Sequence, residues 1–162
     1  MQSKLDNKAL QQPHNHNGCL QHALQAAEQI CSKKGVRLTT IRRRILELIC
    51  ANHKAIGAYE LLDLFRLEDP KAKPVTVYRA LDFLMEAGLV HKVESLNAFI
   101  GCLQAEKQHK SVILICDQCQ NAYEVDATPV YERLFALSES IQFKPKCLTL
   151  ELHGVCASCA EK

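Results

Sequence analysis

Two Cys-x-x-Cys pairs carry the clearest chemistry in this sequence. The first is Cys116-Asp-Gln-Cys119 and the second is Cys156-Ala-Ser-Cys159. Each pair brings two sulfur atoms close enough to hold one metal ion, and four thiolates make the closed tetrahedral ligand set of a structural zinc site. A redox dithiol or a disulfide framework is the alternative explanation of the same spacing. We expect a zinc ion that stabilises the last third of the chain.

Length and composition limit the kinds of protein to which this sequence can belong. The 162 residues suffice for one ordinary domain or two small ones. The chain has no apolar run of membrane-spanning length, and its polar N-terminus lacks the apolar stretch of a secretory signal. These features predict a cytoplasmic protein without a membrane span. In that compartment thiols stay reduced, so nine cysteines indicate metal binding more than disulfides.

Charge is distributed unevenly along the chain. Residues 1–91 hold 13 basic against 9 acidic side chains, whereas residues 92–162 hold 7 against 9. A basic first part beside a mildly acidic, cysteine-rich second part favours contact between the first part and a polyanion.

Helices dominate the first part of the chain. A polar tail is expected over residues 1–18, and hydrophobic periodicity then predicts helices over 20–34, 40–51, 58–67 and 74–87. Thr40 is the candidate N-cap of the second helix, while Pro74 and Gly88 begin and end the fourth. Strands are expected over 89–94 and 98–102. Helices followed by a β-hairpin predict a winged helix-turn-helix domain over 19–103, whose last helix enters the major groove of DNA.

A second unit follows a polar hinge at residues 104–110. Within residues 111–162 the pattern predicts one amphipathic helix, over 128–141, and strands over 111–116, 122–125 and 147–153. This is an α+β unit closed by the two cysteine pairs. The predicted fold class is therefore α+β, with an N-terminal winged helix-turn-helix domain and a C-terminal α/β domain that contains a four-cysteine zinc site.

Particular segments resemble the ferric uptake regulator (Fur) family. They are residues 36–39 (VRLT) and 73–84 (KPVTVYRALDFL), and the resemblance extends from about residue 20 to residue 160. Residues 57–64 (GAYELLDL) and 88–95 (GLVHKVES) look most like the zinc uptake regulator branch of this family. The resemblance implies a homodimeric DNA-binding repressor that uses a metal as corepressor, with residues 111–162 as its dimerisation domain.

One departure from the family helps to choose the branch. Iron-sensing members usually carry a His-His-Asp-His-like cluster just before the first cysteine pair. Here residues 107–111 read KQHKS and retain only His109. The usual iron-sensing site cannot be assembled from this stretch.

The resemblance also implies a sensing site, with ligands His91, Cys102, His109 and Glu124. Two imidazoles, one thiolate and one carboxylate suit tetrahedral Zn²⁺, and the thiolate disfavours hard octahedral cations such as Mn²⁺. Two of these ligands come from the DNA-binding side and two from the dimerisation side. One ion would then fix the angle between the domains. We expect two zinc ions per subunit, one structural and one regulatory.

DNA contacts are expected from the winged domain. Tyr59 and Arg79 are the candidates for base edges, because a guanidinium fork matches the O6 and N7 acceptors of guanine; Thr76 and Tyr78 lie nearby. Phosphate contacts, which position without specifying sequence, are expected from the basic residues Arg37, Arg42, Arg43 and Lys73. Two dimers on one operator are a further possibility, through Asp63 and Arg66, which otherwise pair within one helix.

These expectations define a zinc-responsive repressor of zinc-uptake genes. The alternatives are an iron- or peroxide-sensing repressor of the same family and a thiol redox switch. A hydrolytic enzyme is a third, with His91, His109 and Glu124 as a catalytic zinc triad. It is disfavoured because Cys102 would fill the open coordination position that catalysis needs. We expect no catalytic residues.

Overall fold

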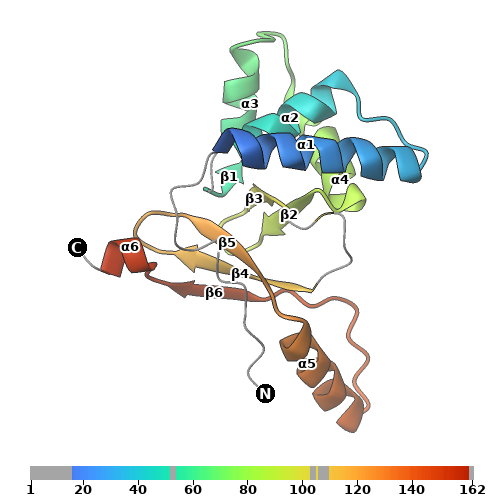
Figure 1. Cartoon of the computed structure of the whole chain (residues 1–162), viewed down its shortest axis with the longest axis vertical. Coiled ribbons are helices and arrows are strands. Elements are labelled where there is room, and N and C mark those ends of the chain that lie inside the picture. Colours follow the sequence, from blue (N-terminus) through green and yellow to red (C-terminus); the bar gives the residue numbers. More distant parts are fainter. Residues whose placement is uncertain (1–15, 52–53, 103–104, 106–109, 161–162) are drawn as a thin grey trace.

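The computed structural model describes residues 16–51, 54–102, 105 and 110–160. The expected tail lies almost wholly outside these ranges, as does most of the expected hinge, including His109. The described elements form a helical part that lies over one face of a C-terminal sheet (Figure 1). This arrangement agrees with the predicted fold class.

Four helices build the N-terminal part: α1 (His16–Lys33), α2 (Thr40–Cys50), α3 (Ala58–Arg66) and α4 (Pro74–Ala87). The start of α1 was predicted too late, because Gly18 lies within the helix, where glycine costs only about 1 kcal/mol relative to alanine. The N-cap of α2 was also wrong by one residue. It is Thr39, whose hydroxyl accepts a hydrogen bond from the Arg42 N–H at 3.4 Å.

Helix α4 has the predicted bounds. Pro74 occupies its first turn, and Gly88 ends it in the left-handed conformation with φ of 79°. The ammonium group of Lys34, just after α1, donates to the carbonyls of Glu86 and Ala87 at 3.3 and 3.1 Å. The C-terminal end of α4 is thereby fixed to the end of α1.

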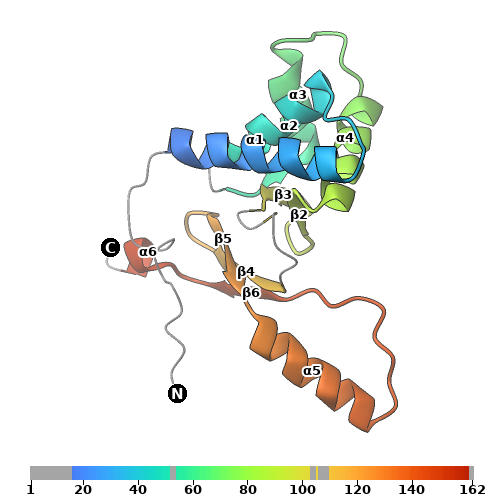
Figure 2. The ribbon, with the colours of Figure 1, turned by 45° about the vertical axis from the view of Figure 1, so that its right-hand side comes forward.

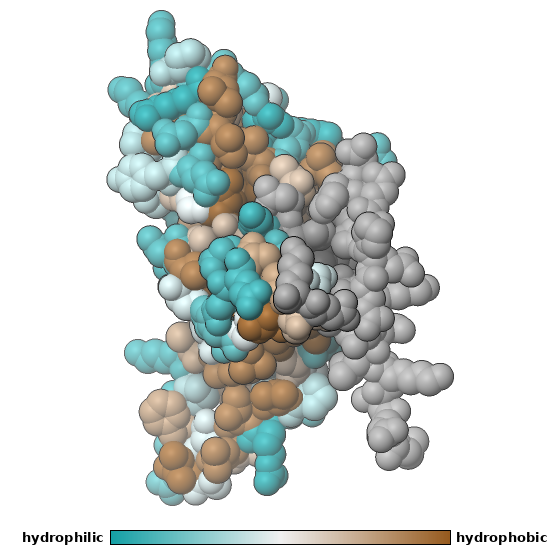
Figure 3. Space-filling model, turned by 90° about the vertical axis from the view of Figure 1, so that its left-hand side faces the viewer, coloured by the Kyte–Doolittle hydropathy of each residue, from teal (hydrophilic) through white to brown (hydrophobic). Residues whose placement is uncertain are grey.

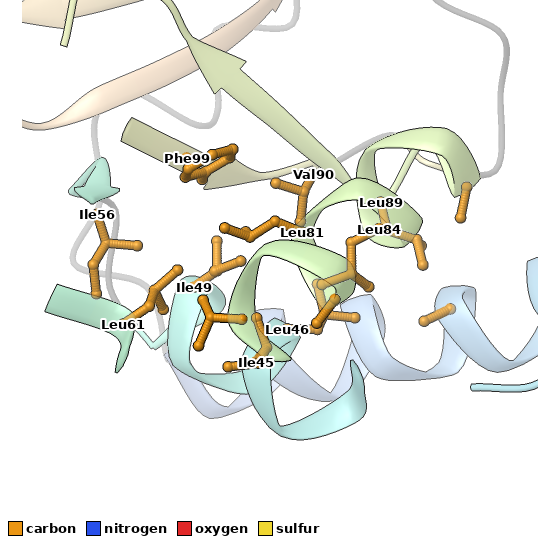
Figure 4. Close-up of a cluster of buried hydrophobic side chains, with 14 of the residues drawn as sticks. Ile45, Leu46, Ile49, Ile56, Leu61, Leu81, Leu84, Leu89, Val90 and Phe99 are labelled. Carbon is orange, nitrogen blue, oxygen red and sulfur yellow. The ribbon is translucent and has the colours of Figure 1, made fainter. Parts of the chain in front are cut away.

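A single apolar core holds α2, α3 and α4 together (Figure 4). Ile45, Leu61, Val77, Leu81 and Leu84 are completely inaccessible to solvent. Because one face of α4 packs in this core, the orientation of the helix is fixed and its opposite face is exposed to solvent.

A three-stranded sheet, the wing, combines a short strand between α2 and α3 with two strands that follow α4. Its strands are β1 (Ile56–Gly57), β2 (Val90–Val93) and β3 (Ala98–Gly101), in the antiparallel order β1-β3-β2. The short strand β1 was not predicted. A Cβ atom at Gly101 would lie 2.5 Å from the Cys50 sulfur, so a side chain there would force the Cys50 side chain of α2 to shift.

The C-terminal sheet has the order β5-β4-β6. Strand β4 (Ser111–Cys116) pairs antiparallel with β5 (Ala122–Asp126) and parallel with β6 (Glu151–Gly154). The prediction placed the last strand at 147–153, but residues 147–150 lie outside it. The Tyr131 hydroxyl lies within hydrogen-bond distance of the Ser111 and Leu148 carbonyls, at 3.1 and 3.3 Å. This side chain connects the start of β4 to the segment that precedes β6.

Two helices complete this part, α5 (Thr128–Ser140) and the unpredicted short helix α6 (Ala157–Ala160). Helix α5 extends away from the rest of the molecule (Figure 2), and none of its residues is buried. No helix among the described residues combines the length and apolar character needed to cross a bilayer.

A second apolar cluster joins the wing to the C-terminal sheet. Val93 and Ile100 of the wing pack with Ile113, Ile115 and Ala122 of the sheet, and all five are buried. The wing and this sheet therefore face each other across a dry contact, which we call the domain boundary.

Candidate metal centres and nucleic-acid interface

The four cysteines of the two Cys-x-x-Cys pairs meet in space. The end of β4 and the following turn supply Cys116 and Cys119, while α6 and the residue before it supply Cys159 and Cys156. Their sulfur atoms all lie within 4.8 Å of one another, and the Cys119 and Cys156 sulfurs are 3.8 Å apart. A tetrahedral zinc ion with Zn–S bonds of about 2.3 Å requires sulfur–sulfur edges of about 3.8 Å. The donor set and its spacing fit zinc.

Local electrostatics prepare this cluster for a cation. Backbone hydrogen bonds from Cys119 and Cys156 lower the pKa of the Cys116 thiol to about 6; the Cys156 N–H lies 3.3 Å from that sulfur. The pKa of Cys159 is raised to about 12, first by its hydrogen bond with Cys156 and then by burial and the other thiols. One thiolate forms readily, whereas four together require a bound positive charge.

A second group of possible ligands lies at the domain boundary. It contains His91 of β2, Cys102 directly after β3, and Glu124 of β5, with ligand atoms within 4.8 Å of one another. The Glu124 Oε1 atom lies 2.8 Å from His91 Nε2 and 3.8 Å from Cys102 Sγ. The fourth predicted ligand, His109, lies outside the described residues. We call the three described residues the boundary cluster.

Burial makes Glu124 unusual. Its side chain is only 2% exposed, and it is the single charged residue that is buried among those the structure describes. An ionised carboxylate is costly in such a place unless it is paired or binds a metal. One imidazole, one thiol and one buried carboxylate within reach of a single point fit zinc by their chemistry.

The expected base-reading residues are accessible to solvent to different degrees. Tyr59 is 68% exposed at the start of α3, and Tyr78 and Arg79 are exposed on α4. Thr76 and Arg79 also line an open hollow of about 240 Å³ between the beginnings of α2 and α4. The first turns of α4 therefore present aromatic, hydroxyl and guanidinium groups outward.

The expected phosphate-binding residues divide into two kinds. Arg37 and Lys73 are exposed. The Arg42 guanidinium instead lies 3.5 Å from the centre of the Phe83 ring and donates to the Arg37 carbonyl at 2.8 Å. Arg43 is paired with two carboxylates, Glu28 and Glu47. Arg43 thus already has acidic partners, which its place beside other arginines in the sequence did not indicate.

Comparison with known proteins agrees with this geometry. The model of the ferric uptake regulator family matches residues 33–153. The chain belongs to this family. Among its relatives, the zinc uptake regulation protein of Escherichia coli (strain K12) is 45% identical over 142 residues, which cover 87% of this chain and 83% of that protein. A ferric uptake regulation protein of Staphylococcus aureus (strain N315) is 25% identical over 135 residues, 83% of this chain and 96% of that one.

Three solved structures of zinc uptake regulators superpose on this chain to different degrees. A zinc uptake regulator complexed with zinc and DNA is 44% identical and has a TM-score of 0.84, covering 88% of this chain and 95% of that one. Holo XcZur is 46% identical with a TM-score of 0.79, covering 86% and 97%. Apo XcZur, at 44% identity and 88% and 99% coverage, has a TM-score of only 0.51. At similar identity, this chain therefore superposes better on the zinc- and DNA-bound regulator and on holo XcZur than on apo XcZur.

Proposed function

We propose that this family member is a cytoplasmic, zinc-responsive transcriptional repressor that binds operator DNA of zinc-uptake genes as a homodimer. The observation that carries the proposal is the boundary cluster, because His91 and Cys102 belong to the DNA-binding part and Glu124 to the other part. The names of the relatives support regulation of zinc uptake rather than an enzymatic role.

The regulatory zinc would be held by His91, Cys102, His109 and Glu124. A bound Zn²⁺ supplies a tetrahedral cation that compensates the buried carboxylate and thiolate. Shared coordination would hold the imidazole of His91 and the thiolate of Cys102 near the Glu124 carboxylate of β5, and the wing would then remain packed on the C-terminal sheet. Helix α4, fixed to the same core as the wing, then takes one orientation relative to its counterpart in the dimer.

The structural zinc would be held by Cys116, Cys119, Cys156 and Cys159. These residues join the β4–β5 turn to the segment that follows β6. The sheet in this part is small, and α5 contributes no buried residue to it. A metal ion is a common way to stabilise a unit whose own core is this limited.

An uncovered apolar surface supports the homodimer. Hydrophobic side chains gather where α5 projects from the molecule (Figure 3), and those exposed on α5 and just after it are Val130, Leu137, Ile141 and Phe143. Leu152 and Val155 are exposed along β6 and beyond it. Patches of this kind mark interfaces between proteins. A second copy of the chain is the partner that the family membership supports.

Pairing of two dimers on one operator is a weaker part of the proposal. Asp63 and Arg66 contact each other on α3, with 3.8 Å between Oδ1 and Nη1. Both side chains are substantially exposed, so this contact leaves them accessible to a neighbouring dimer.

The test is operator binding measured against buffered free Zn²⁺, with protein that already holds its structural zinc. We expect affinity to rise steeply over a narrow range of very low free zinc, and neither Fe²⁺ nor Mn²⁺ to reproduce the rise. Affinity that is flat across the zinc range would exclude zinc as corepressor. A response to Fe²⁺ alone would support the iron-sensing alternative, and loss of binding only on thiol oxidation would support the redox switch.

A further inference from the structure

The domain boundary has a polar contact at the edge opposite the boundary cluster. The Glu151 carboxylate of β6 accepts hydrogen bonds from the backbone N–H groups of Glu94 and Ser95, at 2.6 and 3.1 Å. The His153 ring bridges the Ser95 hydroxyl at 3.0 Å and the Asp117 carboxylate at 2.9 Å. Glu94 and Ser95 form the turn of the wing, whereas the other three residues belong to the C-terminal part.

Sheet register places this contact and the boundary cluster on one face. Glu124, Ile113 and Glu151 lie side by side in one row across β5, β4 and β6. Adjacent strands are about 4.8 Å apart, so the backbones of Glu124 and Glu151 lie about 10 Å apart across the sheet. The apolar cluster fills the centre. The wing therefore rests on a metal-binding edge, a dry middle and a hydrogen-bonded edge.

The order Asp117, His153, Ser95 is also that of a hydrolytic triad. Catalysis by such a triad needs free N–H donors for the negative charge that develops on the substrate oxygen. The N–H groups of Ser95 and Glu94 already bind the Glu151 carboxylate, which carries the same sign of charge as that oxygen. This geometry holds the turn in place and does not stabilise an oxyanion.

We propose that four residues, Ser95, Asp117, Glu151 and His153, form a wing latch. The latch favours the closed arrangement of the domains, in which the wing packs on the C-terminal sheet as in this structure. It thereby sets the free zinc concentration at which the boundary cluster binds its ion. The inference rests on the proposed function. Glu151 and His153 are its positioning residues, since they act on the metal site only through the angle between the domains.

The state of Glu151 agrees with a latch. Burial alone would raise the pKa of Glu151, but hydrogen bonds from the Ser95 hydroxyl and from the Glu94 and Ser95 N–H groups lower it overall. The carboxylate is thus held in its charged form by the turn itself. The backbone N–H groups offer this contact whatever side chains occupy the turn.

Zinc binding is thermodynamically linked to domain closure, and this linkage predicts how a weaker latch changes the apparent zinc affinity. Zinc binds tightly only when the domains are closed, so the apparent dissociation constant is the intrinsic one divided by the closed fraction. Weakening the latch lowers that fraction before zinc arrives. It leaves unchanged the operator-binding surface on α4 and the three boundary ligands.

The experiment compares wild type with Glu151→Ala and, as a matched control, Glu132→Ala on α5. Operator binding is measured against buffered free Zn²⁺, together with thermal unfolding and the zinc content of the cysteine cluster. We expect the Glu151→Ala half-point to move to free zinc about threefold to tenfold higher, with operator affinity at saturating zinc preserved. Unfolding and structural zinc should match wild type, and Glu132→Ala should leave every readout unchanged.

Ser95→Ala is the second variant, for the case that Glu151→Ala loses its structural zinc. It removes the hydroxyl that contacts His153 but keeps the backbone N–H groups, so a smaller shift in the same direction is expected. An unmoved half-point in a folded Glu151→Ala or in Ser95→Ala would overturn the latch. Failure of the proposed function would appear differently, as absence of a zinc response in wild type.

Solution scattering provides a readout that needs no operator. With only the structural zinc bound, Glu151→Ala should have a larger radius of gyration than wild type, and added regulatory zinc should reduce the difference. Equal radii at both zinc levels would likewise contradict the latch.

Discussion

The two clusters of possible zinc ligands differ in where their residues come from. All four cysteines of the first cluster lie in the C-terminal part, in the β4–β5 turn and around α6. In the boundary cluster, His91 comes from the wing, Cys102 from the residue directly after it, and Glu124 from β5. Both clusters contain thiols and both fit one ion, so ligand chemistry alone does not distinguish their roles.

This difference indicates that the effect of a bound ion, on folding stability or on domain orientation, depends on whether its ligands come from one domain or from two. An ion held within one unit adds its binding energy to folding, and structural zinc contributes about 10–16 kcal/mol in small zinc domains at neutral pH. An ion held between units biases their orientation, and coupling between sites is typically about 1–3 kcal/mol. The cysteine cluster should therefore govern stability, and the boundary cluster should govern DNA affinity.

The largest effect is expected when the cysteine cluster is broken. Cys156→Ser removes a zinc ligand and keeps the backbone N–H that contacts the Cys116 sulfur, so the C-terminal part should lose its metal and unfold at a much lower temperature. The N-terminal core contains none of these residues and should keep its helical signal. Zinc content and circular dichroism during heating test this. A variant that melts like wild type without its metal would show that the cluster is not structural.

The boundary cluster should behave in the opposite way. Cys102→Ser should keep the fold and the structural zinc but lose the rise in operator affinity with zinc, about 5- to 150-fold for a coupling of this size. Cys147→Ser is the control, because Cys147 is an exposed thiol outside both clusters. An unchanged zinc response in Cys102→Ser would remove this residue from the sensing site.

A substitution in the DNA-binding helix α4 should affect neither metal cluster. Arg79→Ala should reduce the preference for operator over random DNA by about 1–3 kcal/mol if the guanidinium contacts guanine bidentately. Both metal clusters should be unaffected, so the zinc half-point should stay near that of wild type. Equal loss of affinity for operator and random DNA would instead make Arg79 a phosphate contact.

Local signals in the sequence predicted the helices and the cysteine cluster well. Pro74 and Gly88 fixed the bounds of α4, and two cysteine pairs at metal-binding spacing identified the first cluster. Such signals depend on neighbouring residues and on ligand chemistry. The start assigned to α1 was too late because the helix tolerates Gly18 in its interior. The last strand was predicted too long, and the Tyr131 hydroxyl beside Leu148 is a tertiary contact that the sequence pattern does not reveal.

The contacts at the domain boundary could not be predicted from local sequence signals alone. The resemblance to the family supplied His91, Cys102 and Glu124, but the burial of Glu124 follows from the packing of one sheet on another. The wing latch gave no signal at all, because Glu151 binds backbone N–H groups, which every residue except proline possesses. The contact between Arg43 and Glu28 was likewise hidden, since Glu28 lies on another helix, whereas Glu47 lies at i+4 on the same helix.

The smallest effect is expected from Arg43, and it separates two kinds of arginine on one surface. Each phosphate contact contributes about 0.9 to the slope of log affinity against log salt. Arg37→Ala should reduce that slope by about one contact, because Arg37 is exposed. Arg43→Ala should leave the slope unchanged, because the Arg43 charge is already paired with Glu28 and Glu47. If both variants reduce the slope equally, Arg43 must exchange its carboxylate partners for phosphate when the helices meet DNA, and the N-terminal part is then less rigid than its core implies.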